Sequence, residues 1–152
     1  MKIPFCVPWA IGLVFLCAIA GCGNQGKSNK AEEASPLKPI AKFYGDYVNQ
    51  HQGSVPASES LFLAFLKEPK NAELLKSEFK ITDIDKLLIS PRDNKPYTVY
   101  YGTISNNQGP GGAPVVAYEK VGINGKRFVA SALGYVVEVD ESEFRRMIPD
   151  PR

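Results

Sequence analysis

An apolar segment at the start of the chain sets its first twenty-two residues apart from any folded domain. Lys2 is the only charged residue before Cys22, and the stretch from Trp9 to Ala20 is almost entirely apolar. Two small residues, Ala20 and Gly21, then lead directly into Cys22. A cationic start, an apolar centre and a small-residue exit are typical of a secretory signal peptide. The sequence therefore predicts an exported protein whose fold begins after this segment.

The last four residues of the segment, Ile19-Ala20-Gly21-Cys22, resemble the lipobox of bacterial lipoproteins. In that family the cysteine becomes the first mature residue and is acylated, so the resemblance implies a palmitate-type diacyl or triacyl anchor on Cys22. Two or more acyl chains hold a protein stably on a membrane. Gly23 stands where enteric lipoproteins kept in the inner membrane have Asp, which favours the outer membrane.

Two other interpretations of the segment stay open. An uncleaved transmembrane helix needs about 20 apolar residues, and residues 3–22 reach this length if Pro4 and Pro8 are tolerated. An ordinary signal peptide would leave Cys22 unmodified. We favour the lipoprotein interpretation because a polar stretch follows Cys22 at once.

Cleavage before Cys22 removes 21 of the 152 residues and leaves 131, enough for one domain and a tether. We divide the chain into a lipoprotein signal peptide (1–21), a lipidated Cys22 with a flexible tether (22–36) and a single domain (37–149). The tether carries no large apolar side chain before Pro36, so burial cannot offset the entropy lost on ordering it.

Charge and cysteine content exclude several kinds of site. Lys2 leaves with the signal peptide, so the 18 Lys and Arg residues become 17 against 16 Asp and Glu. This balance argues against nucleic-acid binding, which uses a clustered basic face. Cys6 and Cys17 lie in the signal peptide and Cys22 is assigned to lipid, so the domain has no thiol for a disulfide, a nucleophile or a metal. We expect no cofactor and no metal.

The first half of the domain has the apolar spacing of helices. Apolar residues three or four apart predict a first helix that begins at Leu37 and stops near Gly53. Two shorter helices follow, with Ser58 and Asn71 as their expected N-caps. The residues expected to face inward are Ile40, Tyr44, Tyr47 and Val48 in the first helix, Leu61, Phe62, Phe65 and Leu66 in the second, and Leu74, Leu75 and Phe79 in the third.

The second half has the pattern of β-strands. Strands are predicted over 97–101, 114–121, 126–133 and 135–139, and Asn124-Gly125 indicates a type I′ hairpin. Asp140 and Glu143 resemble a capping box that starts a last helix through Met147. The order predicts an α+β fold in which helices pack on a three- to four-stranded antiparallel meander, with a short C-terminal helix. The first helix is expected to pack against Val116, Tyr118, Val129 and Val137.

Few residues have the spacing of a catalytic or metal site. His51 is the only histidine, and its position near a helix end favours a structural role. Asp83 and Asp85 are two apart, which does not place them on one helical face. The glycine-rich 109–112 segment precedes a strand instead of a helix, so it lacks the context of a phosphate-binding loop. A hydrolase would need a pocket that gathers His51, Asp83, Asp85, Arg92 or Asp93.

Tyrosines in the β half are the strongest indication of a binding site. Strand alternation places Tyr97 and Tyr101 on one face and Tyr100 on the other. If these side chains are exposed beside the glycine-rich loop, they offer a large contact area for a partner protein at low entropic cost. Ordinary cross-strand packing is the alternative explanation.

The segment Ser90-Pro91-Arg92-Asp93-Asn94-Lys95-Pro96-Tyr97, followed by Tyr100-Tyr101-Gly102, resembles the Asp-Pro-x-Gly-x-Pro-Tyr segment of type II secretion pseudopilins. The chain is also similar to small exported proteins of planctomycete-like bacteria. The similarity covers residues 37–148 and implies a pilin-like domain. Asn94 stands where the pseudopilin segment has glycine, and the prepilin cleavage pattern is absent.

Together these features predict a lipid-anchored cell-envelope protein that faces the periplasm or exterior and acts as a non-enzymatic binding or structural module. Its expected contacts are the membrane, through the anchor, and an envelope protein. An accessory component of a pseudopilin-type secretion or pilus system is one alternative. An envelope hydrolase with an unrecognised site is another.

Overall fold

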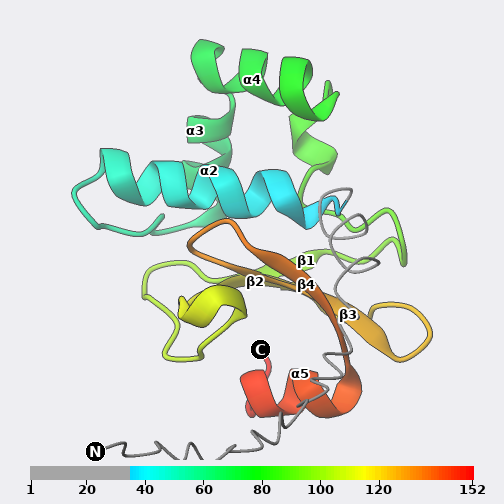
Figure 1. Cartoon of the computed structure of the whole chain (residues 1–152). Helices are drawn as coiled ribbons and strands as arrows, with labels where there is room; N and C mark the ends of the chain where they lie inside the picture. The colour runs from blue at the N-terminus through cyan, green and yellow to red at the C-terminus, as the bar shows by residue number, and fades with distance from the viewer. Residues whose placement is uncertain (1–34) are drawn as a thin grey trace, which may run out of the picture.

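The structure is a computed structural model that describes residues 35–152. Its secondary structure forms three layers: helices over one face of a four-stranded antiparallel sheet, the sheet itself, and a short helix under the other face (Figure 1). This arrangement confirms the predicted α+β class. The predictions for the signal peptide, for Cys22 and for tether residues 23–34 lie outside the described residues.

Three helices and a 3-10 turn form the upper layer. They are α2 (Leu37–Gln50), α3 (Glu59–Leu66), α4 (Pro69–Phe79) and η1 (Ile84–Lys86). Ser58 is the N-cap of α3, as predicted, because its Oγ accepts a hydrogen bond from the Leu61 backbone N–H at 3.3 Å. Leu61 was expected in the core, but it is 50% exposed. The other three residues expected to face inward, Phe62, Phe65 and Leu66, are buried.

The expected N-cap of the third helix is wrong. The N-cap is Glu68, three residues before Asn71, and helix α4 begins at Pro69, whose fixed φ suits the first helical turn. Asn71 therefore lies inside α4, where it is buried, and its amide donates a hydrogen bond to the Phe65 carbonyl at 2.8 Å. This bond joins α4 to the end of α3.

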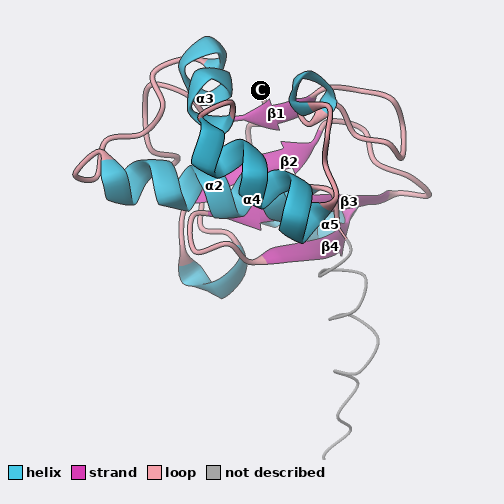
Figure 2. Ribbon diagram, turned by 90° about the horizontal axis from the view of Figure 1, so that it is seen from above, coloured by secondary structure: helices cyan, strands magenta, loops and turns pink. Residues whose placement is uncertain are grey.

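The sheet is a meander in the order β1-β2-β3-β4. Its strands are β1 (Tyr97–Val99), β2 (Val115–Glu119), β3 (Lys126–Ser131) and β4 (Val136–Asp140), and the η2 turn (Pro110–Gly112) lies in the loop before β2. Asn124 and Gly125 both have positive φ, 53° and 70°, as the predicted type I′ hairpin requires. Figure 2 shows α2 and α4 lying over this sheet.

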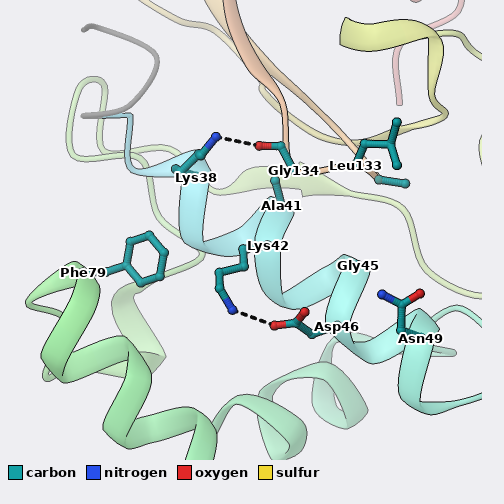
Figure 3. A pocket seen from close by; sticks show the side chains of 10 residues that line it. Lys38, Ala41, Lys42, Gly45, Asp46, Asn49, Phe79, Leu133 and Gly134 are labelled. Carbon is teal, nitrogen blue, oxygen red and sulfur yellow. Dashed lines mark hydrogen bonds and ion pairs between the residues drawn. The ribbon is translucent and has the colours of Figure 1, made fainter. Parts of the chain in front are cut away.

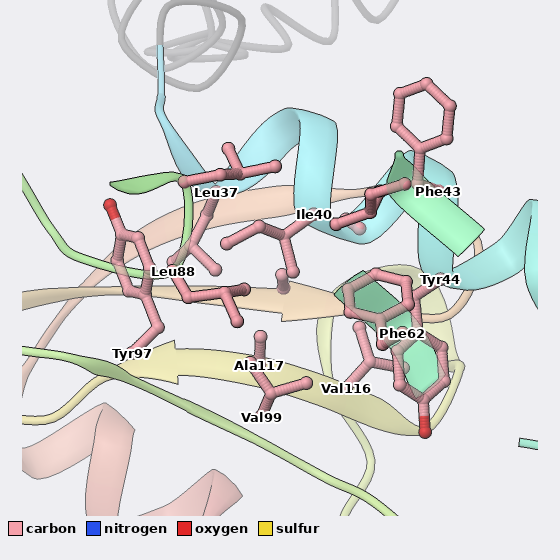
Figure 4. Close-up of a cluster of buried hydrophobic side chains, with 14 of the residues drawn as sticks. Leu37, Ile40, Phe43, Tyr44, Phe62, Leu88, Tyr97, Val99, Val116 and Ala117 are labelled. Carbon is pink, nitrogen blue, oxygen red and sulfur yellow. The ribbon is translucent and has the colours of Figure 1, made fainter. Parts of the chain in front are cut away.

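The larger core lies between the sheet and the upper helices (Figure 4). Helix α2 contributes its apolar face, α3 contributes Phe62, and the strands supply the floor. The Tyr44 and Phe62 rings meet edge to face, with their centroids 5.8 Å apart. The side chains labelled in the figure are Leu37, Ile40, Phe43, Tyr44, Phe62, Leu88, Tyr97, Val99, Val116 and Ala117.

A β-bulge corrects the predicted packing of α2 on the sheet. The register between β2 and β3 shifts between Val115 and Ala117, so Val116 and Ala117 both join the core beneath α2. Such a bulge resets the alternation of side chains along the strand. Tyr118 consequently points to the opposite face, although it was expected to meet α2. Val129 and Val137 belong to that opposite face as well.

A second, smaller core lies under the sheet and is covered by α5 (Glu141–Met147). Asp140 caps this helix as predicted, because its Oδ1 accepts a hydrogen bond from the Glu143 N–H at 2.9 Å. That bond and the one from Ser142 hold the pKa of Asp140 below its usual value. Phe144 is fully buried, with its ring centroid 5.3 Å from that of Tyr118.

Tyr44 makes the stability of the larger core sensitive to alkaline pH. Burial raises the pKa of Tyr44 to about 12, and its hydroxyl donates a hydrogen bond to the Tyr100 carbonyl at 2.8 Å. The neutral phenol therefore stabilises the fold fully below pH 10, the usual tyrosine pKa, and this contribution is lost as the pH rises from 10 to 12. We expect the free energy of unfolding, measured in urea, to fall across this range, and to fall less in Tyr44→Phe. Equal slopes for the two proteins would contradict this assignment.

Candidate interaction surface

The three tyrosines predicted to bind a partner are not an exposed row. Tyr97 and Tyr100 are only 7% and 4% exposed, and Tyr101 is partly buried. The predicted alternation is correct, since Tyr97 and Tyr101 pack with the larger core and Tyr100 with the smaller one. Both faces of this segment are covered by helices or loops, which is why the hydroxyls are withdrawn from solvent. Burial raises the pKa of both Tyr97 and Tyr101.

The residues considered for hydrolysis have separate local partners. His51 ends α2, where its Nδ1 lies 2.8 Å from the Tyr47 carbonyl oxygen and its ring stacks on the Tyr47 ring at 3.9 Å. Asp83 pairs with Lys86 at 3.1 Å, and this contact lowers the pKa of Asp83. Asp85 instead pairs with Lys67 at 2.6 Å. Within residues 35–152, no group of three or more His, Cys, Asp or Glu side chains could hold a metal ion.

The Ser90–Tyr97 segment is held to the sheet by a buried carboxylate. Glu119, at the end of β2, is fully buried and accepts hydrogen bonds from the Ser90 hydroxyl at 3.0 Å and the Phe128 N–H at 2.9 Å. The Arg92 guanidinium lies 3.4 Å from Glu119 and 2.8 Å from Glu138 of β4, and it covers the Phe128 ring at 4.5 Å. Arg92 thus spans three strands and fixes the loop before β1.

Sequence reasoning missed the partners of Arg92. Glu119 ends an otherwise apolar strand, and a single carboxylate in that position is the signal that could have found it. Asp93 of the same loop accepts hydrogen bonds from the Lys95 and Gly122 N–H groups, at 2.9 and 3.0 Å. The loop residues Arg92 and Asp93 are therefore engaged in holding the fold.

An open groove of about 350 Å³ runs between α2, the end of α4 and the turn that joins β3 to β4 (Figure 3). The Lys38 ammonium donates a hydrogen bond to the Gly134 carbonyl at 2.9 Å, and Lys42 pairs with Asp46 at 2.8 Å. Gly45 permits α2 to lie close to the β3–β4 turn, because a Cβ on Gly45 would lie 2.9 Å from the Ala132 carbonyl oxygen. Phe79 closes the far wall of the groove.

The turn beside the groove exposes large apolar side chains. The Ser131 carbonyl accepts from the Gly134 N–H, and the Ser131 N–H donates to the Tyr135 carbonyl, both at 2.9 Å. Gly134 has φ +80°, which suits the residue that closes such a turn. The turn that these bonds close carries two exposed side chains: Leu133 is 67% exposed and Tyr135 is 55% exposed.

We call the groove residues Lys38, Lys42 and Leu133, together with Tyr135 on the other side of Gly134, the turn surface. Tyr135 lies outside the groove, in a separate hollow that Gly111 and Met147 also line. Isolated exposed apolar residues are ordinary, but neighbouring ones mark interaction sites. The nearby Ile104 is 57% exposed and borders a small apolar hollow together with Ala132. Three of the six exposed large apolar residues in the described chain therefore lie around this turn.

The glycine-rich loop contributes to the turn surface from beneath. Gly111 has φ +70°, and a Cβ on it would lie 2.7 Å from the Tyr135 ring, so the ring rests directly on the Gly111 backbone. Sequence reasoning placed Leu133 at the end of a strand and gave Tyr135 no separate role. The available signal was a large apolar residue on each side of a turn glycine.

Comparison with protein-family models, with curated proteins and with solved structures finds no match to this chain. In the described part of the chain, no helix has both the length and the apolar character needed to cross a bilayer. The class defined by the fold is an α+β domain in which one long helix crosses an antiparallel meander.

Proposed function

We propose that the chain is a lipid-anchored cell-envelope protein whose domain serves as a non-enzymatic binding or structural module. The observation that carries this function is the turn surface, where exposed Leu133 lines the groove with Lys38 and Lys42 and exposed Tyr135 follows on the other side of Gly134. An apolar contact flanked by cations suits an interaction surface better than it suits catalysis. The lipobox residues that end in Cys22 support the anchor.

Placement of the turn surface also favours a binding role. The β3–β4 turn is held by its own backbone bonds and by Lys38, so its apolar residues are presented in a fixed geometry. A pre-organised surface loses little conformational entropy when it binds. Removing Leu133 from the surface should therefore weaken binding while the core below stays intact.

The anchor is tested by replacing Cys22 with serine. Without a thiol to acylate, the protein should move from the membrane fraction to the soluble fraction of fractionated cells. The intact mass of the wild-type protein should show the loss of residues 1–21 and the addition of acyl chains. Tight membrane association of Cys22→Ser, or an unprocessed mass, would refute the lipoprotein assignment.

The binding role is tested separately with a photo-crosslinking amino acid at position 133 in living cells. We expect it to form adducts that the same probe at position 121 does not form. Val121 is a matched control, because it is 54% exposed and lies in the loop between β2 and β3, at the opposite end of β3. Equal labelling from the two positions would contradict a specific role for the turn surface.

A second candidate function is an accessory component of a pseudopilin-type secretion or pilus system. The observation that favours it is the long helix α2 lying across an antiparallel meander, with the Ser90–Tyr97 segment leading into the first strand. Co-purification of the protein with such a machine would support this function. Its absence from the purified machine would leave the first proposal in place.

A further inference from the structure

We infer that the turn surface rests on the lipid bilayer to which Cys22 anchors the chain. This inference depends on the proposed anchor and identifies the partner of the same surface as a membrane with anionic headgroups. Three observations carry it: how the chain enters the domain, which side chains the turn exposes, and how the groove is charged.

The anchor keeps the domain close to the bilayer. Lys38 is sixteen residues after Cys22, and sixteen extended residues span at most about 58 Å. Every face of the domain therefore stays near the membrane, and even a weak affinity of one face is strengthened by the high local concentration. The Lys38 ammonium also contacts Gly134, so the domain's first helix and the β3–β4 turn lie together on this face.

The exposed side chains are of the kind that enter the bilayer interface. Leu133 is aliphatic, and Tyr135 combines an aromatic ring with a hydroxyl that can stay among the headgroups. They lie on either side of Gly134, at the end of a hairpin closed by backbone hydrogen bonds. The backbone groups of Ser131, Gly134 and Tyr135 that form these bonds keep their partners when the tip enters the bilayer.

The charge of the groove is of the correct sign for an anionic surface. Lys38, Lys42 and Asp46 are its charged lining residues, and Lys42 pairs with Asp46. Among these three, one positive charge is therefore left in excess, at Lys38. Basic residues beside apolar ones are typical of proteins that lie on anionic membranes. A protein partner would also accept Leu133 and Tyr135, but the anchor supplies the membrane without a further component.

The test places a fluorescent depth probe on the lipidated protein. Acylation occupies the Cys22 thiol and the other natural cysteines leave with the signal peptide, so Leu133→Cys provides a single reactive thiol. The labelled protein is reconstituted into vesicles of phosphatidylethanolamine and phosphatidylglycerol, with Val121→Cys as the matched control. We expect the emission of an NBD probe at position 133 to shift to the blue, to increase several-fold and to be quenched by spin-labelled lipid. The probe at 121 should behave as in water.

Each other outcome overturns the inference in a distinguishable way. If the protein floats with the vesicles but the position-133 probe stays in water, the docking is wrong and the anchor stands. If the protein does not float with the vesicles, the anchor fails and the docking fails with it. A position-133 probe that is shielded only after envelope proteins are added identifies a protein as the occupant, in place of the membrane.

Discussion

Replacing Glu119 by alanine is expected to destabilise the domain by about 3–5 kcal/mol, the usual cost of removing one partner from a buried charged pair. Glu119 is fully buried, and its carboxylate satisfies the Ser90 hydroxyl and the Phe128 N–H. Without it, Arg92 keeps a guanidinium that is largely withdrawn from water, with only Glu138 as a carboxylate partner. Urea denaturation of the purified protein measures the loss.

Two related variants separate the contributions of charge and hydrogen bonding. Glu119→Gln keeps one acceptor oxygen, enough for either the Ser90 hydroxyl or the Phe128 N–H but not for both. We therefore expect a smaller loss than in Glu119→Ala. Glu138→Gln removes the more exposed partner of Arg92 and should cost less again, because its side chain is 29% exposed and the charge is partly hydrated. Equal stability of Glu119→Ala and the wild type would mean that Glu119 does not hold the Ser90–Tyr97 loop.

Replacing Phe144 by alanine is expected to cost about 3–5 kcal/mol, the range for a buried Phe truncated to Ala. Phe144 is fully buried and attaches the short helix α5 to the sheet. Its ring meets Tyr118 edge to face and is covered by the Arg127 guanidinium at 4.2 Å. The loss should appear both in urea denaturation and as faster amide exchange in α5.

Phe62→Ala is the matched control for the second prediction. Phe62 is equally buried, but it lies in the core between the sheet and the upper helices. Its replacement should lower global stability by a similar amount without a selective loss of protection in α5. If Phe144→Ala accelerates exchange evenly across the domain, α5 is not a separately attached element.

Features set by neighbouring residues were predictable from the sequence. The N-cap Ser58, the type I′ turn at Asn124-Gly125 and the N-cap Asp140 all occur where they were predicted. Each depends on groups within a few residues of one another, so the local sequence suffices. The missed cap at Asn71 shows the limit, because its amide is used to bind the Phe65 carbonyl of another helix.

Contacts between distant segments decided to which face of the sheet each side chain points and how far it is buried. One bulge in β2 turned Tyr118 away from α2, and packing against both layers withdrew Tyr97 and Tyr100 from solvent. The apolar pattern of one strand does not reveal a β-bulge in its pairing with the next strand. Nor does it reveal which helix, from a distant part of the sequence, packs on the strand.

The sequence by itself determined the α+β order, the ends of most helices and the hairpin, because backbone geometry and short-range capping govern these features. Only the tertiary structure placed Arg92 between Glu119 and Glu138, and only it brought Lys38 to the turn that exposes Leu133. Glu119 lies 27 residues after Arg92, and Gly134 lies 96 residues after Lys38. Contacts across such separations form when the sheet closes and the long first helix packs on it, so they follow from the packed chain as a whole.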